Sequence, residues 1–139
     1  MTSQQAAQIA HLLNTLNQLQ KNYTVKEVLE RAADYLFELD DGAVVACVEV
    51  KKVQWYQCEM CHLSVDGKHQ GQGLGKRLIR RGETKAKAEG ARIIQCTIRV
   101  GNVASEEAFR RSGYREACSF FNARTGNYVA VWQKVLCPE

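Results

Sequence analysis

The stretch CEMCH, from Cys58 to His62, brings together side chains that could do chemistry. Its C-x-x-C-H spacing is typical of covalent haem attachment, and cysteine and histidine are also zinc ligands. A structural zinc site would need a second ligand pair, and the cysteines at 47, 96 and 118 have no other Cys or His two to four residues away. We therefore expect neither haem nor metal. As a strand, the same stretch offers Glu59 and His62 as candidate bases.

Three alternating glycines, Gly71, Gly73 and Gly75, lie in the segment KHQGQGLGKRLI at residues 68–79. Such a loop can present successive backbone N–H groups, and a following helix adds the positive end of its dipole. The segment therefore predicts a phosphate-binding loop, with a tight turn that binds no ligand as the alternative. It matches neither a P-loop, which needs Ser or Thr after Gly-Lys, nor the G-x-G-x-x-G of dinucleotide-binding folds.

The hydrophobic pattern places both stretches in one α/β domain spanning residues 1–139. Helices are predicted at 3–20, from a Thr24–Glu27 capping box through Leu36, at 73–89 and at 103–112. Strands are predicted at 35–39, 43–53, 55–65, 92–98, 114–122 and 127–136. The first three strands read as antiparallel neighbours, and the overall order is ααβββαβαββ.

The composition and charge of the chain exclude some classes of protein and favour others. No apolar run approaches the roughly 20 residues of a membrane span, and the N-terminus lacks a basic region and cleavage site, so we expect a cytoplasmic protein with no membrane partner. The six cysteines are then expected to be free thiols. A net charge of +4 suits a polyanionic cofactor. Nucleic-acid binding is disfavoured, because no aromatic residues lie among the basic residues of 76–81.

The run from Gln70 to Gly75 has the form Q-x-x-G-x-G and resembles the acetyl-CoA-binding motif of the GNAT family of N-acetyltransferases. A second family segment is matched downstream by Asn102, Ser105, Ala108, Phe109, Gly113 and Tyr114. The resemblance is specific across residues 57–122. It implies a mixed, largely antiparallel, twisted sheet with flanking helices. The family's first strand is apparently missing here, which leaves a sheet edge where a partner protein or a second copy could bind.

The resemblance implies acetyl-CoA as co-substrate, with its pantetheine arm between two splayed strands, the one that ends at Val65 and the one at 92–98. The residues it assigns to cofactor binding are Leu63, Val65, Gln70, Gly71, Gln72, Gly73, Leu74, Gly75, Lys76, Asn102 and Phe109. Lys76, Arg77 and either Arg80 or Arg81 are the candidates for the 3′-phosphate.

The resemblance also identifies Glu59 as the general base, because it stands six residues before Val65, as in the histone-acetyltransferase branch of the family. His62 is the second candidate, although strand alternation puts it on the opposite face unless a bulge intervenes. Phe109 stands where most small-molecule members carry the tyrosine that protonates the CoA thiolate. We therefore expect base-assisted direct attack by a primary amine, from a protein lysine, a protein N-terminus or a small molecule. The alternative is a catalytically silent binding or structural module.

Overall fold

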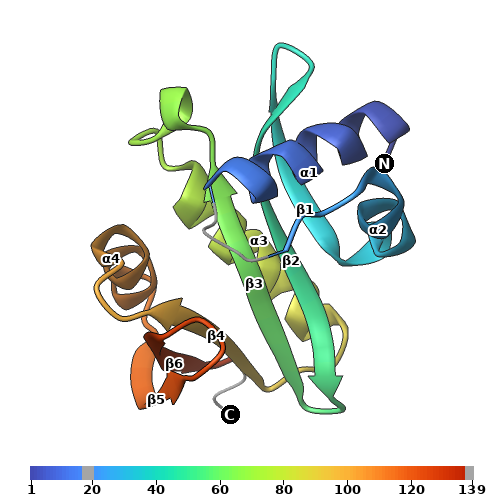
Figure 1. The fold of residues 1–139 in the computed structure, drawn as a ribbon. Coiled ribbons are helices and arrows are strands. Elements are labelled where there is room, and N and C mark those ends of the chain that lie inside the picture. The colour runs from blue at the N-terminus through green and yellow to red at the C-terminus, as the bar shows by residue number, and fades with distance from the viewer. Residues whose placement is uncertain (17–20, 137–139) are drawn as a thin grey trace.

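The computed structural model describes residues 1–16 and 21–136, and its centre is a mixed sheet with the strand order β1-β2-β3-β4-β6-β5 (Figure 1). Neighbouring strands are antiparallel except β3 and β4, which are parallel. This confirms the predicted fold. The strands are β1 (Tyr35–Asp40), β2 (Ala43–Gln54), β3 (Gln57–Val65), β4 (Ile93–Arg99), β5 (Arg115–Asn122) and β6 (Asn127–Val135).

Helices cover the sheet on both faces (Figure 1). On one face, α1 (Ser3–Leu16) and α2 (Val25–Glu30) pack on β1 and β2 through a core that includes Ile9, Leu13 and Val28. On the other face, α3 (Leu74–Ala88) and α4 (Val103–Arg111) enclose the larger core. None of the helices in the described residues combines the length and apolar character that a bilayer crossing needs.

The first two helices are predicted to extend to residues 20 and 36. The end of the predicted first helix, 17–20, lies outside the described residues. The prediction that the second helix runs through Leu36 is wrong, because α2 ends at Glu30, a short 3-10 turn η1 spans Ala32–Asp34, and Leu36 lies in β1 opposite Val48. Pairing with β2 therefore overrides the helical spacing of the apolar residues. The predicted cap is confirmed, since Glu27 N donates to Thr24 Oγ1 at 3.1 Å.

The sheet divides where β3 meets β4. Only residues 57–59 of β3 pair with β4, through Ile93, Ile94 and Gln95, and beyond Glu59 the two strands separate. On the side that faces β2, β3 contains a bulge. Cys47 pairs with Ser64 and Glu49 pairs with Cys61, so two steps along β2 correspond to three steps along β3. His62 has a φ of 57° within this bulge. The separation confirms the predicted splay of these strands.

Candidate active site

The glycine loop forms one wall of a groove. Gly71 and Gly73 both have a φ of 79°, and Gly73 is the N-cap of α3. This left-handed conformation is strained for any residue with a Cβ, which explains why glycine stands there. The loop lines a groove of about 320 Å³ against α4 and the end of β3. Its lining residues are Leu63, Val65, His69, Gln70, Gly71, Gly73, Leu74, Gly75, Ala104, Ser105 and Ala108.

A second groove, of about 420 Å³, lies where β3 and β4 separate. It is lined from β3 by Met60, His62 and Leu63, from β4 by residues 96–99, from α4 and its N-cap by Asn102, Ser105 and Phe109, and from the β5–β6 hairpin by Asn122, Thr125, Asn127 and Val129. The end of α1 adds Leu16. Leu63 and Ser105 line both grooves, so the two adjoin and run from the glycine loop into the gap between the strands.

Most of the residues that the sequence assigned to the cofactor lie along this path. Leu63, Val65 and five loop residues line the first groove, whereas Asn102 and Phe109 line the second. The side chain of Asn102 caps α4 by accepting from Ser105 N at 3.4 Å. Gln72 and Lys76 are exposed and line neither groove.

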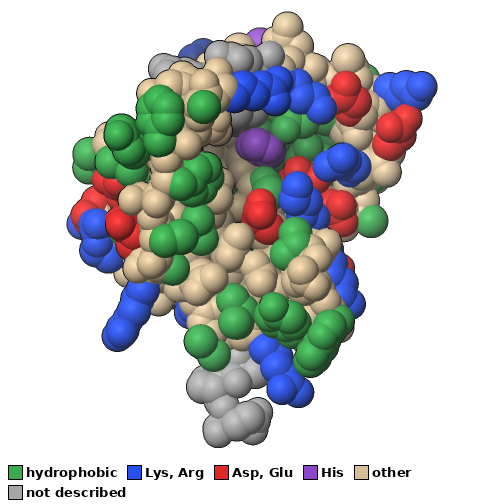
Figure 2. All heavy atoms as spheres, turned by 60° about the horizontal axis from the view of Figure 1, so that its bottom comes forward, with side chains coloured by type: hydrophobic (Ala, Val, Ile, Leu, Met, Phe, Trp, Pro, Cys, Tyr) green, Lys and Arg blue, Asp and Glu red, His purple; other side chains and the backbone are tan. Residues whose placement is uncertain are grey.

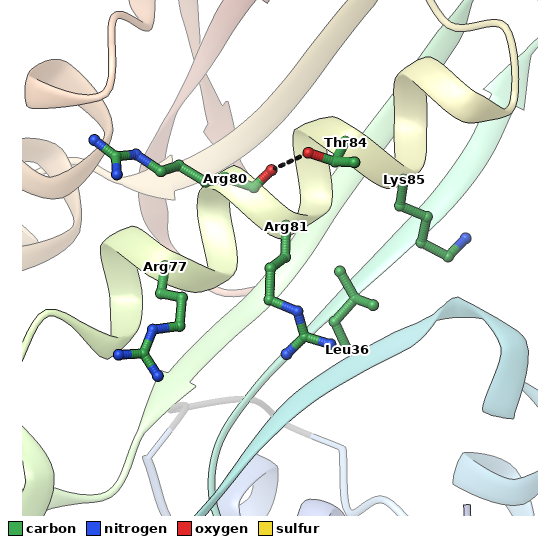
Figure 3. Close-up of a pocket in the computed structure, with 6 residues that line it drawn as sticks. All are labelled: Leu36, Arg77, Arg80, Arg81, Thr84 and Lys85. Atoms are coloured by element: carbon green, nitrogen blue, oxygen red, sulfur yellow. Dashed lines mark hydrogen bonds between the residues drawn. The ribbon is translucent and has the colours of Figure 1, made fainter.

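The basic side chains of α3 point in different directions (Figure 3). Arg77 and Arg81 both pair with Glu38 of β1, at 3.1 and 2.8 Å, and Arg81 also donates to the Phe37 carbonyl at 2.9 Å. They line a separate groove of about 370 Å³ on the β1 side of α3. Both guanidinium groups are thus paired with Glu38, and the assignment of Arg77 or Arg81 to the 3′-phosphate stays a prediction. Arg80 lines the same groove, although its guanidinium points away from those of Arg77 and Arg81.

Glu59 sits where the strands begin to separate. It lies opposite Lys51 of β2 and beside Gln95 of β4. Its carboxylate is half-buried, and the Cys61 thiol donates to it with Sγ and Oε2 3.6 Å apart. Glu59 does not itself line the second groove. Any proton it takes from a substrate in that groove would therefore pass through a water molecule or follow a small movement of its side chain.

His62 does line the groove, because the bulge breaks the strand alternation that would have turned it away. Its Nε2 lies 2.9 Å from the Tyr23 hydroxyl, and the two rings meet edge to face with centroids 5.6 Å apart. The side chain of Asn14 in α1 binds the backbone of Tyr23: Asn14 Nδ2 donates to Tyr23 O at 3.0 Å, and Asn14 Oδ1 accepts from Tyr23 N at 2.7 Å. Burial lowers the pKa of His62, so the ring is neutral at pH 7 and able to accept a proton.

A buried carboxylate, that of Glu49 in β2, lies near His62 and Tyr23. Its side chain is 3% exposed, it stands opposite Cys61, and its Oε2 is 3.4 Å from Arg31 Nη1. Sequence reasoning missed Glu49, because in AVVACVEV an acid at that position looks like an ordinary solvent-facing strand residue. In the view of Figure 2 a histidine side chain lies in a hollow with acidic and basic side chains on one side of it. The α1 and α2 side of the gap therefore carries two carboxylates, Glu49 and Glu59.

Phe109 is buried, with 3% of its surface exposed, and its ring packs edge to face on Tyr114 at 5.0 Å between centroids. Phe109 lines the second groove, and its phenyl ring has no proton to donate there. Tyr114 belongs to the α3 and α4 core.

The C-x-x-C-H residues are divided by the sheet. Cys58 is buried in the α3 and α4 core, and its thiol lies 3.8 Å from Glu89 Oε2, whereas Cys61 faces Glu59 on the opposite side. Strand geometry therefore prevents the two sulfurs from binding one ion. In the part of the chain that the structure describes, no group of three or more His, Cys, Asp or Glu side chains is arranged to hold a metal.

Comparison with known proteins agrees with this geometry. The fold is shared with Ard1 from Thermoplasma volcanium (TM-score 0.85, 12% identity, covering 99% of this chain and 95% of that one). It is also shared with yncA, a putative acetyltransferase from Salmonella typhimurium with its cofactor acetyl-CoA (TM-score 0.84, 18% identity, covering 100% and 92%). No curated protein sequence matches the chain significantly. The sequence model of the acetyltransferase (GNAT) family matches residues 6–114, and the chain therefore belongs to that family.

Proposed function

We propose that this protein transfers the acetyl group of acetyl-CoA to a primary amine. The observation that carries the proposal is the continuous path from the glycine loop to the gap between β3 and β4, which His62 lines. Glu59 stands beside the gap, at the last residue of β3 that pairs with β4. A phosphate-binding loop at one end and candidate bases at the other suit a long thioester whose reactive end must meet an amine.

The residues along the path fit acetyl-CoA. Gly71 and Gly73, both in the left-handed backbone conformation, present backbone N–H groups at the start of the 15-residue helix α3. The positive end of the helix dipole there favours binding of the pyrophosphate. Leu63 and Val65 would flank the pantetheine arm at the junction of the grooves. Among the solved structures that share the fold, yncA contains acetyl-CoA and Rv2747 from Mycobacterium tuberculosis contains CoA. For the 3′-phosphate we propose Arg80 or Lys76, which are not paired with Glu38 as Arg77 and Arg81 are.

Glu59 is proposed as the base and His62 as the second candidate. An alkylammonium must lose a proton before its nitrogen can attack, because its pKa lies well above 7. The base takes that proton, and the neutral amine nitrogen bonds to the acetyl carbon. The nitrogen then gives its second proton to solvent as the carbon–sulfur bond breaks, which leaves the amide and the CoA thiolate. Since Phe109 cannot donate, the CoA thiolate takes its proton from solvent. This is the base-assisted direct attack expected of the histone-acetyltransferase-like branch.

The acceptor side of the gap carries carboxylates and basic residues together, since Arg31 pairs with Glu49 and Lys51 lies opposite Glu59. Glu49 and Glu59 lie there with the neutral His62, and Tyr23 provides an aromatic face. A protein lysine, a protein N-terminus or a small amine would each satisfy this site. A catalytically silent module with the same fold is the competing function, and Phe109 is the residue that favours it. We also propose that a partner protein or a second copy of the chain binds at the β1 edge of the sheet.

Release of CoA thiol should be measured with acetyl-CoA and a panel of small amines and of peptides with a lysine or free N-terminus, with mass spectrometry of the product. We expect an amide product with the wild type and a loss of about 10²–10⁴-fold in turnover for Glu59→Gln, the usual contribution of a positioned base. Affinity for CoA should be unchanged. His62→Gln is the comparison, and Glu30→Gln, an exposed acid at the end of α2, is the control.

The outcomes separate the alternatives. Equal turnover and equal pH dependence in Glu59→Gln and wild type, with loss in His62→Gln, would assign the base to His62. CoA binding without turnover on any amine would support the silent module. No heat of binding at millimolar CoA would overturn the acetyl-CoA assignment itself.

A further inference from the structure

The imidazole of His69 is held between two aspartates from separate segments. His69 Nδ1 lies 3.0 Å from Asp66 Oδ2, and His69 Nε2 lies 2.9 Å from Asp40 Oδ2. An ionised carboxylate only accepts hydrogen bonds, so both contacts are hydrogen bonds when both ring nitrogens carry a proton. The geometry is therefore that of an imidazolium clasped by two carboxylates.

The clasp joins the entry of the phosphate-binding loop to the sheet. Asp40 is the last residue of β1, Asp66 directly follows β3, and His69 ends the 3-10 turn η2 (Gly67–His69), immediately before Gln70. The backbone holds the same segment, because Asp66 N donates to Val45 O and His69 N to Asp66 O, each at 2.8 Å. His69 also lines the groove of the glycine loop.

The charge of the ring matters because of what the groove binds. Among the described residues that line this groove, His69 is the one that titrates near neutrality. With the ring protonated, His69, Asp40 and Asp66 together carry one negative charge. With the ring neutral they carry two, next to a loop that must accept a pyrophosphate. Deprotonation therefore weakens the clasp and adds repulsion toward the ligand at the same time.

We propose that His69 is a positioning residue of the phosphate-binding loop. As an imidazolium between Asp40 and Asp66, His69 fixes the start of the loop and offsets the charge of the two aspartates. The protein therefore loses affinity for acetyl-CoA when the ring loses its proton. The inference rests on the proposed cofactor. It adds a residue outside the glycine motif and a pH dependence that the motif does not contain.

The direction of the pH effect follows from the contacts. Hydrogen bonds to Asp40 and then to Asp66 raise the pKa of His69 above its ordinary value, and these two carboxylates, from β1 and from the segment after β3, are the charged groups that face it. The clasp is therefore complete below about pH 6.5 and is lost as the pH rises through the raised pKa. A bound pyrophosphate should raise that pKa further, and each unit of increase corresponds to about a tenfold loss of affinity on deprotonation.

Calorimetric titration with dephospho-CoA between pH 6 and 9 tests the proposal, because this probe keeps the pyrophosphate but lacks the 3′-phosphate, which itself titrates near pH 6. We expect the dissociation constant of the wild type to rise roughly three- to tenfold across the range. His69→Gln should bind with a nearly constant dissociation constant, and Asp40→Asn should move the midpoint to lower pH. His11→Gln, an exposed histidine of α1, should behave as the wild type.

Nitrogen NMR of the imidazole gives a second readout that needs no ligand. Both ring nitrogens of His69 should be protonated at pH 6 in the wild type, and the titration should move to lower pH in Asp40→Asn. A His69 ring that is neutral at pH 6 would overturn the proposal, as would His69→Gln retaining the wild-type pH dependence. Failure of every CoA compound to bind would instead contradict the proposed function, with the clasp still judged by NMR.

Discussion

At the scale of single residues, the acid–base region depends on contacts that join distant parts of the chain. His62 contacts Tyr23, and Tyr23 contacts Asn14, so the orientation of the imidazole depends on α1 through Tyr23. Strand alternation alone would have placed His62 on the other face of the sheet. The bulge that brings it into the groove costs a positive φ at a non-glycine residue, and such local strain often accompanies functional sites.

We predict that Tyr23→Phe lowers turnover by roughly two- to tenfold, the effect of losing about 1 kcal/mol of hydrogen bonding to His62. The phenyl ring keeps the edge-to-face packing, so the fold should be unchanged. Steady-state kinetics from pH 6 to 9 provide the measurement, with Tyr128→Phe at the exposed hairpin as the matched control. A pH profile that shifts together with the rate would indicate His62 as the base, whereas a lower rate with an unchanged profile agrees with Glu59.

At the scale of elements, the glycine loop and α3 act as one unit, since Gly73 is both part of the loop and the N-cap of the helix. An added Cβ at Gly73 would meet no heavy atom within 4 Å, so its glycine is required by the backbone conformation rather than by crowding. Gly82 differs, because a Cβ there would lie 2.6 Å from Met60 Cε and 3.1 Å from Val50 Cγ2. That glycine lets α3 pack closely on β2 and β3.

We predict that Gly73→Asp abolishes CoA binding, because the new carboxylate would face the pyrophosphate. Gly73→Ala should retain weakened binding, since it introduces only the backbone strain, of about 1–2 kcal/mol. Gly90→Asp is the control, because Gly90 has a φ of 88° and open space around it at the other end of α3. Calorimetry measures the binding and thermal unfolding measures the strain. CoA affinity in Gly73→Asp equal to that of Gly73→Ala would contradict the loop assignment.

At the scale of the whole molecule, the sheet consists of two parts joined by a short parallel contact. β1, β2 and β3 form one part and β4, β6 and β5 the other, and three residue pairs connect β3 to β4. The two parts are also joined through the common core beneath α3 and α4, where Phe109, Ile94 and Leu78 are buried. A ligand lying in the gap would contact both parts at once.

We predict that acetyl-CoA at about 100 times its dissociation constant stabilises the fold by about 2.7 kcal/mol. For a chain of this size that corresponds to a rise in Tm of roughly 10 °C. Scanning calorimetry measures the rise, and amide hydrogen exchange should show the strongest added protection at the end of β3, in β4 and at the start of α4. Gly73→Asp should show neither effect. Protection limited to α1 and α2 would place the ligand elsewhere.

The sequence alone was sufficient for the features that depend on contiguous residues. The spacing of Gly71, Gly73 and Gly75 was enough to predict a tight loop before a helix, and the structure has this loop at the start of α3. Phosphate binding by the loop stays a prediction. The strand and helix order was readable for the same reason, because hydrophobic periodicity and caps are local. The resemblance carried by these segments named the family, which the family comparison confirms.

Tertiary structure decided the features that depend on pairing between distant segments. Arg77 and Arg81 both donate to Glu38, which lies 39 and 43 residues earlier in the chain. The bulge at His62 arises from the register between β2 and β3, and the surroundings of His62 come from Asn14, Tyr23 and Glu49. The clasp at His69 likewise needs Asp40, 29 residues away. Charges and hydrogen bonds act between residues that are close in space. The spacing of residues in the sequence therefore does not predict these contacts, which form only when the strands pair.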